Sequence, residues 1–138
     1  MKKNNQILIA FLSIAIMFAF NACEREAEHH DLSTTDINLV INSPTDTQEF
    51  EAEDTVFINA TIDAPSEMHG YEVHLTRLAD TVEVLTKDID LHTNHFTINE
   101  TYINPGLVHS DMELEIVAMI DHNGKSTSKK VHFHCHQK

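Results

Sequence analysis

The chain has 138 residues, of which 41% are hydrophobic, and 22 acidic residues against nine basic ones give a formal net charge of −13. This length suits one domain with a modest core. The acidity argues against nucleic-acid binding, because contact with phosphates needs basic patches. It favours solubility and the attraction of cations instead.

The N-terminus resembles the signal of a bacterial lipoprotein. Lys2 and Lys3 precede an uncharged apolar run, 7–20, that is shorter than the ~20 residues of a membrane-spanning helix. The stretch "FNAC" then puts Cys23 at the position of a lipobox cysteine. We therefore expect a signal peptide at 1–22 and a lipid anchor on Cys23. Ordinary signal-peptidase cleavage and an uncleaved anchor are the alternatives.

Residues 23–35 carry charge without an apolar period, so we expect a flexible acidic tether. Acidic residues directly after the cysteine also resemble the surface-export signal of Bacteroidetes lipoproteins. We expect a cell-envelope protein attached to the outer membrane, with the leaflet left open. His29 and His30 in the tether are a weak candidate metal site, although such a pair is more often incidental.

Seven runs of alternating apolar and polar residues follow, at a spacing typical of β-sandwiches. They cover 37–42, 55–62, 70–78, 81–85, 95–103, 112–120 and 130–136. The short Ala79-Asp80 link predicts a hairpin between the third and fourth runs. No run has a convincing helical period. We expect an all-β, immunoglobulin-like seven-stranded sandwich over residues 36–138, as one domain.

Several stretches carry a resemblance at the level of the fold. "INSPTDTQEFEAEDTVFINATI" is similar to the opening of bacterial Ig-like and PKD-like modules. "HGYEVHL" and "DHNGKSTSKKVHFHC" resemble the middle and end of small Ig-like lipoproteins of Bacteroidetes. This resemblance covers most of residues 37–136 and implies a fold without implying an activity. Hydrolase and metalloprotease motifs such as G-x-S-x-G and H-E-x-x-H are absent from the sequence, so we expect a binding module and not an enzyme.

The last two runs form a predicted hairpin whose pairing can be worked out from its turn. Asn123-Gly124 favours a two-residue type I′ turn, in which His122 would face Lys125. The inner face would then pair apolar residues: Ile116 with Val131, Leu114 with Phe133, and Met112 with Cys135. The outer face would pair carboxylates with imidazoles: Glu115 with His132, Glu113 with His134, and Asp111 with His136.

The outer face of this hairpin is the predicted functional site. Neighbours two residues apart on one strand are ~6.5 to 7 Å apart, so two imidazoles could share one ion. Histidine with carboxylate suits zinc or copper. The leading hypothesis is therefore a lipid-anchored envelope module that binds a transition metal. Its ligands and orienting partners would be His74 from the neighbouring third run, Glu113, Glu115, His132 and His134.

The sequence also offers weaker candidate ligands and competing functions. His136 and Asp111 lie at the end of the same row, and Cys135 would join only if it turned outward instead of packing as a small buried hydrophobe. A ladder of ion pairs without a metal explains the same pattern. The other alternative is a non-metal interaction or spacer domain, accessory to an outer-membrane transporter or a surface adhesin. Four histidines near strand ends have no assigned role: His69, His92, His95 and His109.

Overall fold

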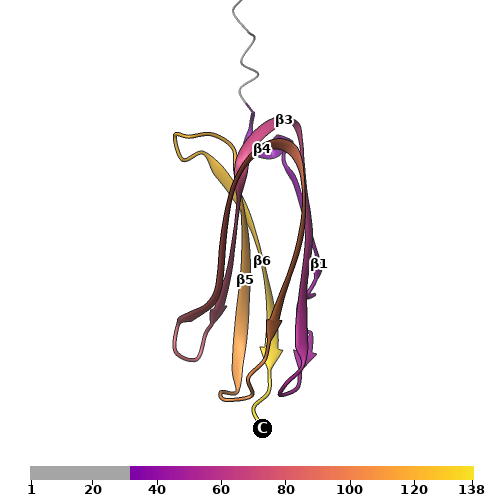
Figure 1. Cartoon of the computed structure of the whole chain (residues 1–138), viewed down its shortest axis with the longest axis vertical. Helices are drawn as coiled ribbons and strands as arrows, with labels where there is room; N and C mark the ends of the chain where they lie inside the picture. Colours follow the sequence, from indigo (N-terminus) through magenta and orange to yellow (C-terminus); the bar gives the residue numbers. More distant parts are fainter. Residues whose placement is uncertain (1–31) are drawn as a thin grey trace, which may run out of the picture. The chain divides into compact units, whose positions relative to one another are not determined.

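The structure, a computed structural model, describes residues 32–138 and is all-β (Figure 1). The expected signal peptide, the candidate lipid-anchor residue Cys23 and the His29-His30 pair lie outside the described residues. The elements are η1 (Thr34–Asp36, a 3-10 turn), β1 (Asn38–Ser43), β2 (Glu49–Phe50), β3 (Thr55–Arg77), β4 (Val82–Ile103), β5 (Ser110–Met119) and β6 (Ser126–Cys135). Within this part of the chain, no helix has the length and hydrophobicity needed to cross a membrane.

β3 and β4 form one long antiparallel ribbon that bends over on itself (Figure 1). The pairing starts at Thr55 with Ile103, ends at Arg77 with Val82, and shifts register between Asp63 and Gly70. All seven predicted runs lie in strands and the expected hairpin is confirmed, but β3 and β4 each contain two of the runs without a loop between them.

A glycine lets the two strands of this ribbon approach closely beside the bend. A Cβ on Gly70 would lie 2.0 Å from the carbonyl oxygen of Ile89, a distance that no real Cβ contact reaches. Only glycine therefore fits at this position unless the backbone shifts.

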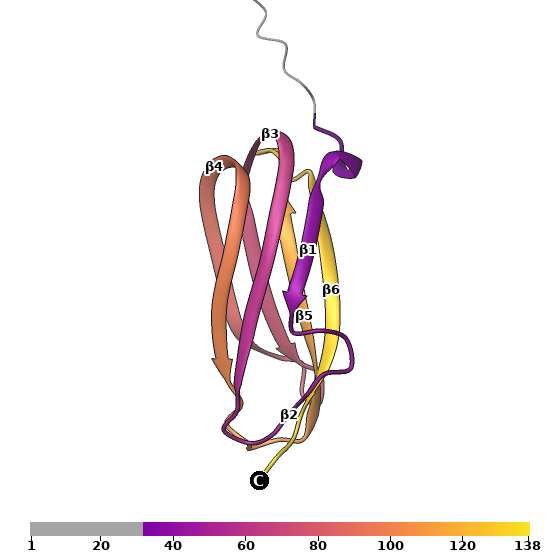
Figure 2. The same cartoon turned by 90° about the vertical axis from the view of Figure 1, so that its right-hand side faces the viewer.

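The bend places the two halves of the ribbon in two layers (Figure 2). The first half of β3 pairs with β1 and with the second half of β4. The second half of β3 pairs with β5 and with the first half of β4, and β5 pairs with β6. The third predicted run therefore lies beside the sixth, as expected for an immunoglobulin-like sandwich.

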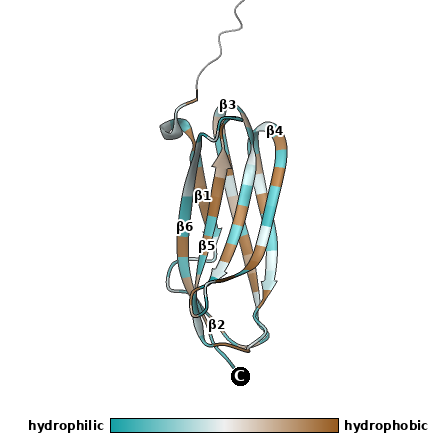
Figure 3. Cartoon of the chain, turned by 90° about the vertical axis from the view of Figure 1, so that its left-hand side faces the viewer, coloured by the Kyte–Doolittle hydropathy of each residue, from teal (hydrophilic) through white to brown (hydrophobic). Residues whose placement is uncertain are grey.

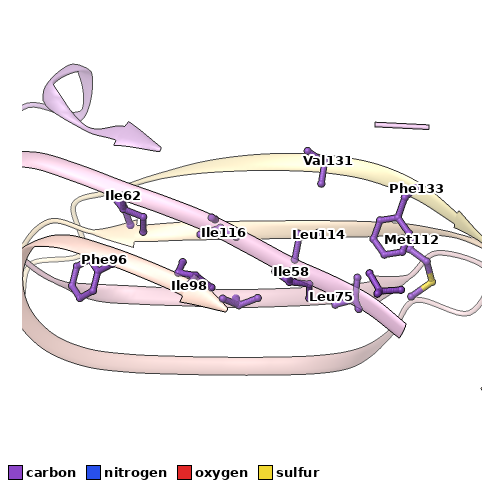
Figure 4. Close-up of a cluster of buried hydrophobic side chains, with 14 of the residues drawn as sticks. Ile58, Ile62, Leu75, Phe96, Ile98, Met112, Leu114, Ile116, Val131 and Phe133 are labelled. Carbon is purple, nitrogen blue, oxygen red and sulfur yellow. The ribbon is translucent and has the colours of Figure 1, made fainter. Parts of the chain in front are cut away.

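Hydrophobic and hydrophilic residues alternate along the strands (Figure 3). The hydrophobic side chains fill one core between the layers (Figure 4). The best-buried large side chains, each under 2% exposed, include Ile58, Ile62, Leu75, Ile98, Met112, Leu114 and Ile116. Burial of one such side chain stabilises the fold by roughly 1.5–3 kcal/mol. The apolar residues of β6, Val131, Phe133 and Cys135, belong to this core, so the predicted inner face of the last hairpin is confirmed.

The folded part includes residues that were expected in the tether. Leu32 is 4% exposed and packs with the core. The Ser33 side chain accepts a hydrogen bond from the Thr35 amide, and Asp36 accepts one from the Ser33 amide, which caps η1. The folded unit therefore includes residues before the boundary expected at residue 36.

β2 is a two-residue strand that no periodic pattern could reveal. It runs parallel to β6, with Glu49 beside His134 and Phe50 beside Cys135. The His134 amide donates to the carbonyl of Gln48, and the His136 amide donates to that of Phe50. This short strand brings a carboxylate to the end of β6 that carries the histidines.

Candidate metal centre

The pairing of β5 with β6 differs by two residues from the predicted pairing. Met112 faces Phe133 and Leu114 faces Val131, whereas Cys135 faces Ser110. The predicted partners were therefore wrong while the faces were right. Side chains alternate with a period of two, so a shift of two residues keeps each one on its own side of the sheet.

The turn explains the shift. Asp121 accepts hydrogen bonds from the amides of Asn123 and Lys125 through one carboxylate oxygen, at 2.8 and 3.0 Å. The Ile120 amide donates to the carbonyl of Lys125, so the residue opposite Lys125 on the β5 side is two positions further from the turn than a two-residue turn requires. Only Gly124 of the two turn residues has positive φ. A type I′ turn needs positive φ at both, so a longer loop forms.

The observed pairing gives the outer-face carboxylates new partners. Glu113, not Glu115, faces His132, and its Oε2 lies 3.0 Å from His132 Nε2. Asp111, not Glu113, faces His134, with 2.7 Å between Oδ1 and Nδ1. Glu115 faces Lys130.

We call the middle of this face the carboxylate ladder; it consists of Glu72, His74, Glu83, Glu113, Glu115, Lys130 and His132. Lys130 Nζ lies 2.7 Å from Glu113 and 3.2 Å from Glu115. The hydrogen bond from Lys130 lowers the pKa of Glu113, and the hydrogen bond from His132 lowers it further by a smaller amount. The imidazoles and the lysine of the ladder are thus already paired with carboxylates of the same protein.

His74 illustrates the ladder most clearly. Its Nε2 lies 2.9 Å from Glu72 and its Nδ1 lies 2.5 Å from Glu83. Hydrogen bonds to Glu72 and Glu83 raise the pKa of His74 despite the opposing effect of partial burial. Both ring nitrogens are used by carboxylates, so neither lone pair is available to an ion.

Three histidines converge where β6 ends, and we call them the C-terminal histidine cluster: His109, His134 and His136. Each offers one nitrogen, and these atoms all lie within 4.8 Å of one another. The Nε2 atoms of His134 and His109 are 3.0 Å apart. At this distance one imidazole can donate its N–H to the lone pair of the other, or both nitrogens can bind one cation, so the two atoms share either a proton or a metal ion.

Carboxylates orient two of these rings from outside the cluster. Asp111 takes the Nδ1 hydrogen of His134, which leaves Nε2 as the atom that faces His109. Glu49 on β2 lies 3.4 Å from Nε2 of His136, which leaves Nδ1 for the cluster. A carboxylate behind the imidazole is the usual support of a metal-binding histidine, because it fixes the tautomer and the ring orientation.

Asn104 is a buried anchor next to the cluster. It is 2% exposed, and its side-chain amide donates to the carbonyls of His136 and Glu51, at 2.8 and 3.0 Å. Its side-chain oxygen accepts from the Gly106 amide at 3.1 Å. These bonds hold the backbone at His136 against the loop after β4 and so fix the point from which its side chain extends.

Cys135 takes no part in the cluster. The side chain points inward and is 2% exposed, and burial raises the pKa of its thiol to about 11. A metal ligand would have to be the thiolate. The expectation that Cys135 is a small buried hydrophobe is confirmed.

The predicted site residues thus divide into two groups. His134, His136 and Asp111 come together at the end of β6. Four others lie in the carboxylate ladder: His74, Glu113, Glu115 and His132. His109 was missed because it precedes β5. The last residue pair of β5 and β6 is Ser110 with Cys135, and the same register extended by one residue places His109 opposite His136. A predicted turn longer than two residues would therefore have revealed His109.

No family model and no curated protein matches the sequence. Among solved structures, the chain is similar to the fibronectin(III)-like modules of Clostridium thermocellum CbhA. The TM-score is 0.48 at 16% sequence identity, and the alignment covers 72% of this chain and 96% of that chain. The fold assignment rests on the strand pairing described above.

Proposed function

We propose that this protein is a binding module that holds a transition-metal ion at the C-terminal histidine cluster. The observation that carries the proposal is the pair of Nε2 atoms of His109 and His134, which face each other at 3.0 Å while Asp111 occupies the far side of the His134 ring. His136 completes a set of three imidazoles. Such a set suits zinc or copper(II).

The dimensions of the cluster fit one ion after small side-chain rotations. Zinc–nitrogen bonds are about 2.0–2.1 Å long, so two ligand nitrogens of one tetrahedral ion are separated by roughly 3.4 Å. The cluster nitrogens lie within 4.8 Å of one another, and His109 is exposed and free of the core. Asp111 and Glu49 would stay outside the ligand set as orienting groups.

We also propose that the module is attached to the outer membrane through a lipid on Cys23, which lies outside the described residues. The sequence pattern of the N-terminus supports this location. Cys23→Ala should move the protein from the detergent phase to the aqueous phase in a Triton X-114 partition. An unchanged distribution would contradict the anchor.

Calorimetry with Zn²⁺ and Cu²⁺ tests metal binding on the full chain in detergent, purified without a histidine tag. The parent should carry His29→Ala and His30→Ala, so that the tether pair adds no signal. We expect His134→Ala/His136→Ala to abolish binding at the cluster. His95→Ala is the matched control, because His95 is exposed and both of its ring nitrogens have partners, Asp63 and Thr97.

Two results would reject the proposal. The first is an affinity of the parent weaker than about 10 μM, which corresponds to less than roughly 7 kcal/mol of binding free energy. The second is equal binding by the parent and by His134→Ala/His136→Ala.

A protein-interaction module is the second candidate, and one exposed patch favours it. Phe57 and Ile103 are 56% and 63% exposed on the outer face of the layer that contains β1. Phe57 and Ile103 are diagonal neighbours on adjacent strands, because Thr55 pairs with Ile103 and Phe57 pairs with Thr101. Cross-linking in membranes with a photoreactive residue at position 57 would capture such a partner, and loss of the product with Ile103→Ser would support this function.

A further inference from the structure

A second group of histidines lies where the sandwich carries the bend of β3–β4 and the loop between β5 and β6. In Figure 1 this is the end opposite the C-terminus. His69 comes from β3, His92 from β4, and His122 from the β5–β6 loop. Residues from distant parts of the chain thus converge on one place, away from the C-terminal histidine cluster.

The rings of this group are packed against each other. The ring centroids of His69 and His122 are 3.4 Å apart, and those of His69 and His92 are 4.3 Å apart. One nitrogen from each ring lies within 4.8 Å of the others. Three imidazoles in such contact gain little from one another, because they repel when protonated and offer unshared lone pairs when neutral.

His69 supplies the second, independent observation. Its Nδ1 atom is buried and has no hydrogen-bond partner among the described residues. A buried polar atom without a partner costs roughly 1–3 kcal/mol, so native proteins satisfy such atoms with water or an ion. A water or an ion bound at this end of the sandwich would supply the partner that this atom lacks.

Carboxylates surround the group. Asp90 lies 3.7 Å from His92 Nε2, and Asp90 and Asp121 line the same pocket as His69 and His122. Their negative charge favours a cation over a neutral or anionic ligand. Three imidazoles with a carboxylate nearby again match the preferences of zinc and copper(II).

The local backbone holds the group in place from two sides. Asp121 receives the amides of Asn123 and Lys125, which fixes the loop that carries His122. Gly70 lets β3 and β4 approach closely beside His69. The same loop that shifts the pairing of β5 with β6 therefore also sets the position of His122.

We propose that His69, His92 and His122 form a second transition-metal site, which is independent of the C-terminal histidine cluster. The protein would then hold one ion at each end of the sandwich. This inference does not depend on the first site, because the two groups share no residue and no orienting carboxylate.

Zinc titration of the full chain in detergent, again with His29→Ala and His30→Ala, tests the inference. The parent should bind about two equivalents of zinc, and His92→Ala/His122→Ala should bind about one. Both substituted residues are exposed, so the fold should be kept. His95→Ala, a change of another exposed histidine on β4, should leave the stoichiometry at the parent value.

Nitrogen-15 spectra of the histidine rings give a second readout. In the His134→Ala/His136→Ala chain, zinc should move a ring-nitrogen resonance of His69 into the range of a metal-bound imidazole. Addition of chelator should reverse the shift.

The outcomes separate the two sites. Zinc binding that is reduced by His92→Ala/His122→Ala supports the inference, even if His134→Ala/His136→Ala changes nothing and the proposed function fails. Zinc binding that is unaffected by His92→Ala/His122→Ala overturns the inference, and it leaves the proposed function standing if the other double variant abolishes binding. Ring resonances of His69 that do not respond to zinc also overturn it.

Discussion

The carboxylate ladder and the C-terminal histidine cluster lie on the same outer face, yet their histidines have different surroundings. In the ladder each imidazole meets carboxylates, as in His74 between Glu72 and Glu83. In the cluster, His134 meets one carboxylate and one histidine. Two carboxylates favour the cationic form of the imidazole between them, whereas an imidazole with a carboxylate behind it and a histidine in front can direct a lone pair toward a shared point. The partners of a histidine therefore indicate its role better than its presence on a face does.

The largest difference in zinc affinity should appear when one imidazole is removed from the cluster and, in a separate variant, one from the ladder. His109→Ala should weaken zinc binding by more than the roughly 10- to 100-fold that loss of an orienting partner costs, because a ligand is lost. His132→Ala in the ladder should leave the affinity unchanged, since its Nε2 is bonded to Glu113. Calorimetry on both variants makes the comparison. Equal losses would mean that the ladder and the cluster form one site.

The anchor next to the cluster should affect stability. Asn104→Leu would leave the buried carbonyls of Glu51 and His136 without a donor, at a cost of about 1–3 kcal/mol for an unsatisfied buried group. Urea unfolding measures this change. Asn99→Leu, at an exposed position of β4, is the matched control and should be close to neutral. A stability equal to that of the parent would show that Asn104 does not hold this end of β6.

A smaller effect should follow from changing one carboxylate in each region. Asp111→Asn should lower zinc affinity by about 10-fold, because the amide supports the tautomer of His134 less well than the carboxylate does. Glu113→Gln in the ladder should not change the affinity. If zinc titration gave the reverse order, the ion would belong to His132.

The smallest effect concerns the pH dependence of stability. The pKa of His74 is raised in the folded protein, so its ion pairs stabilise the fold fully below the unfolded pKa of ~6.5, and this contribution is lost as the pH rises through the folded pKa. The pairs lie at the surface and should contribute less than about 1 kcal/mol. In urea unfolding at a series of pH values, the stability advantage of the parent over His74→Gln should be present at pH 5.5 and shrink as the pH rises. A constant difference across the series would argue against a protonated His74.

Much of the fold could be predicted from the period-two pattern. The alternation in β5 and β6 identified Met112, Leu114 and Phe133 as inner residues, and all three are buried. The pattern could not determine the pairing, because apolar residues remain opposite apolar residues after a shift of two. The side chain of Asp121 decided the loop, and with it which carboxylate meets which histidine.

The period-two pattern alone was enough to predict that the domain is all-β and that its last strand carries histidines on the outer face, since the alternation of side chains is a local property of the strand. Which histidines meet depends on how distant parts of the chain fold together. β2 is too short to leave a pattern, yet it brings Glu49 to His136. His69, His92 and His122 are far apart in the chain and come together only because a bent ribbon and a capped loop meet at one end of the sandwich. Such contacts depend on loop length and strand curvature, which a period-two pattern does not encode.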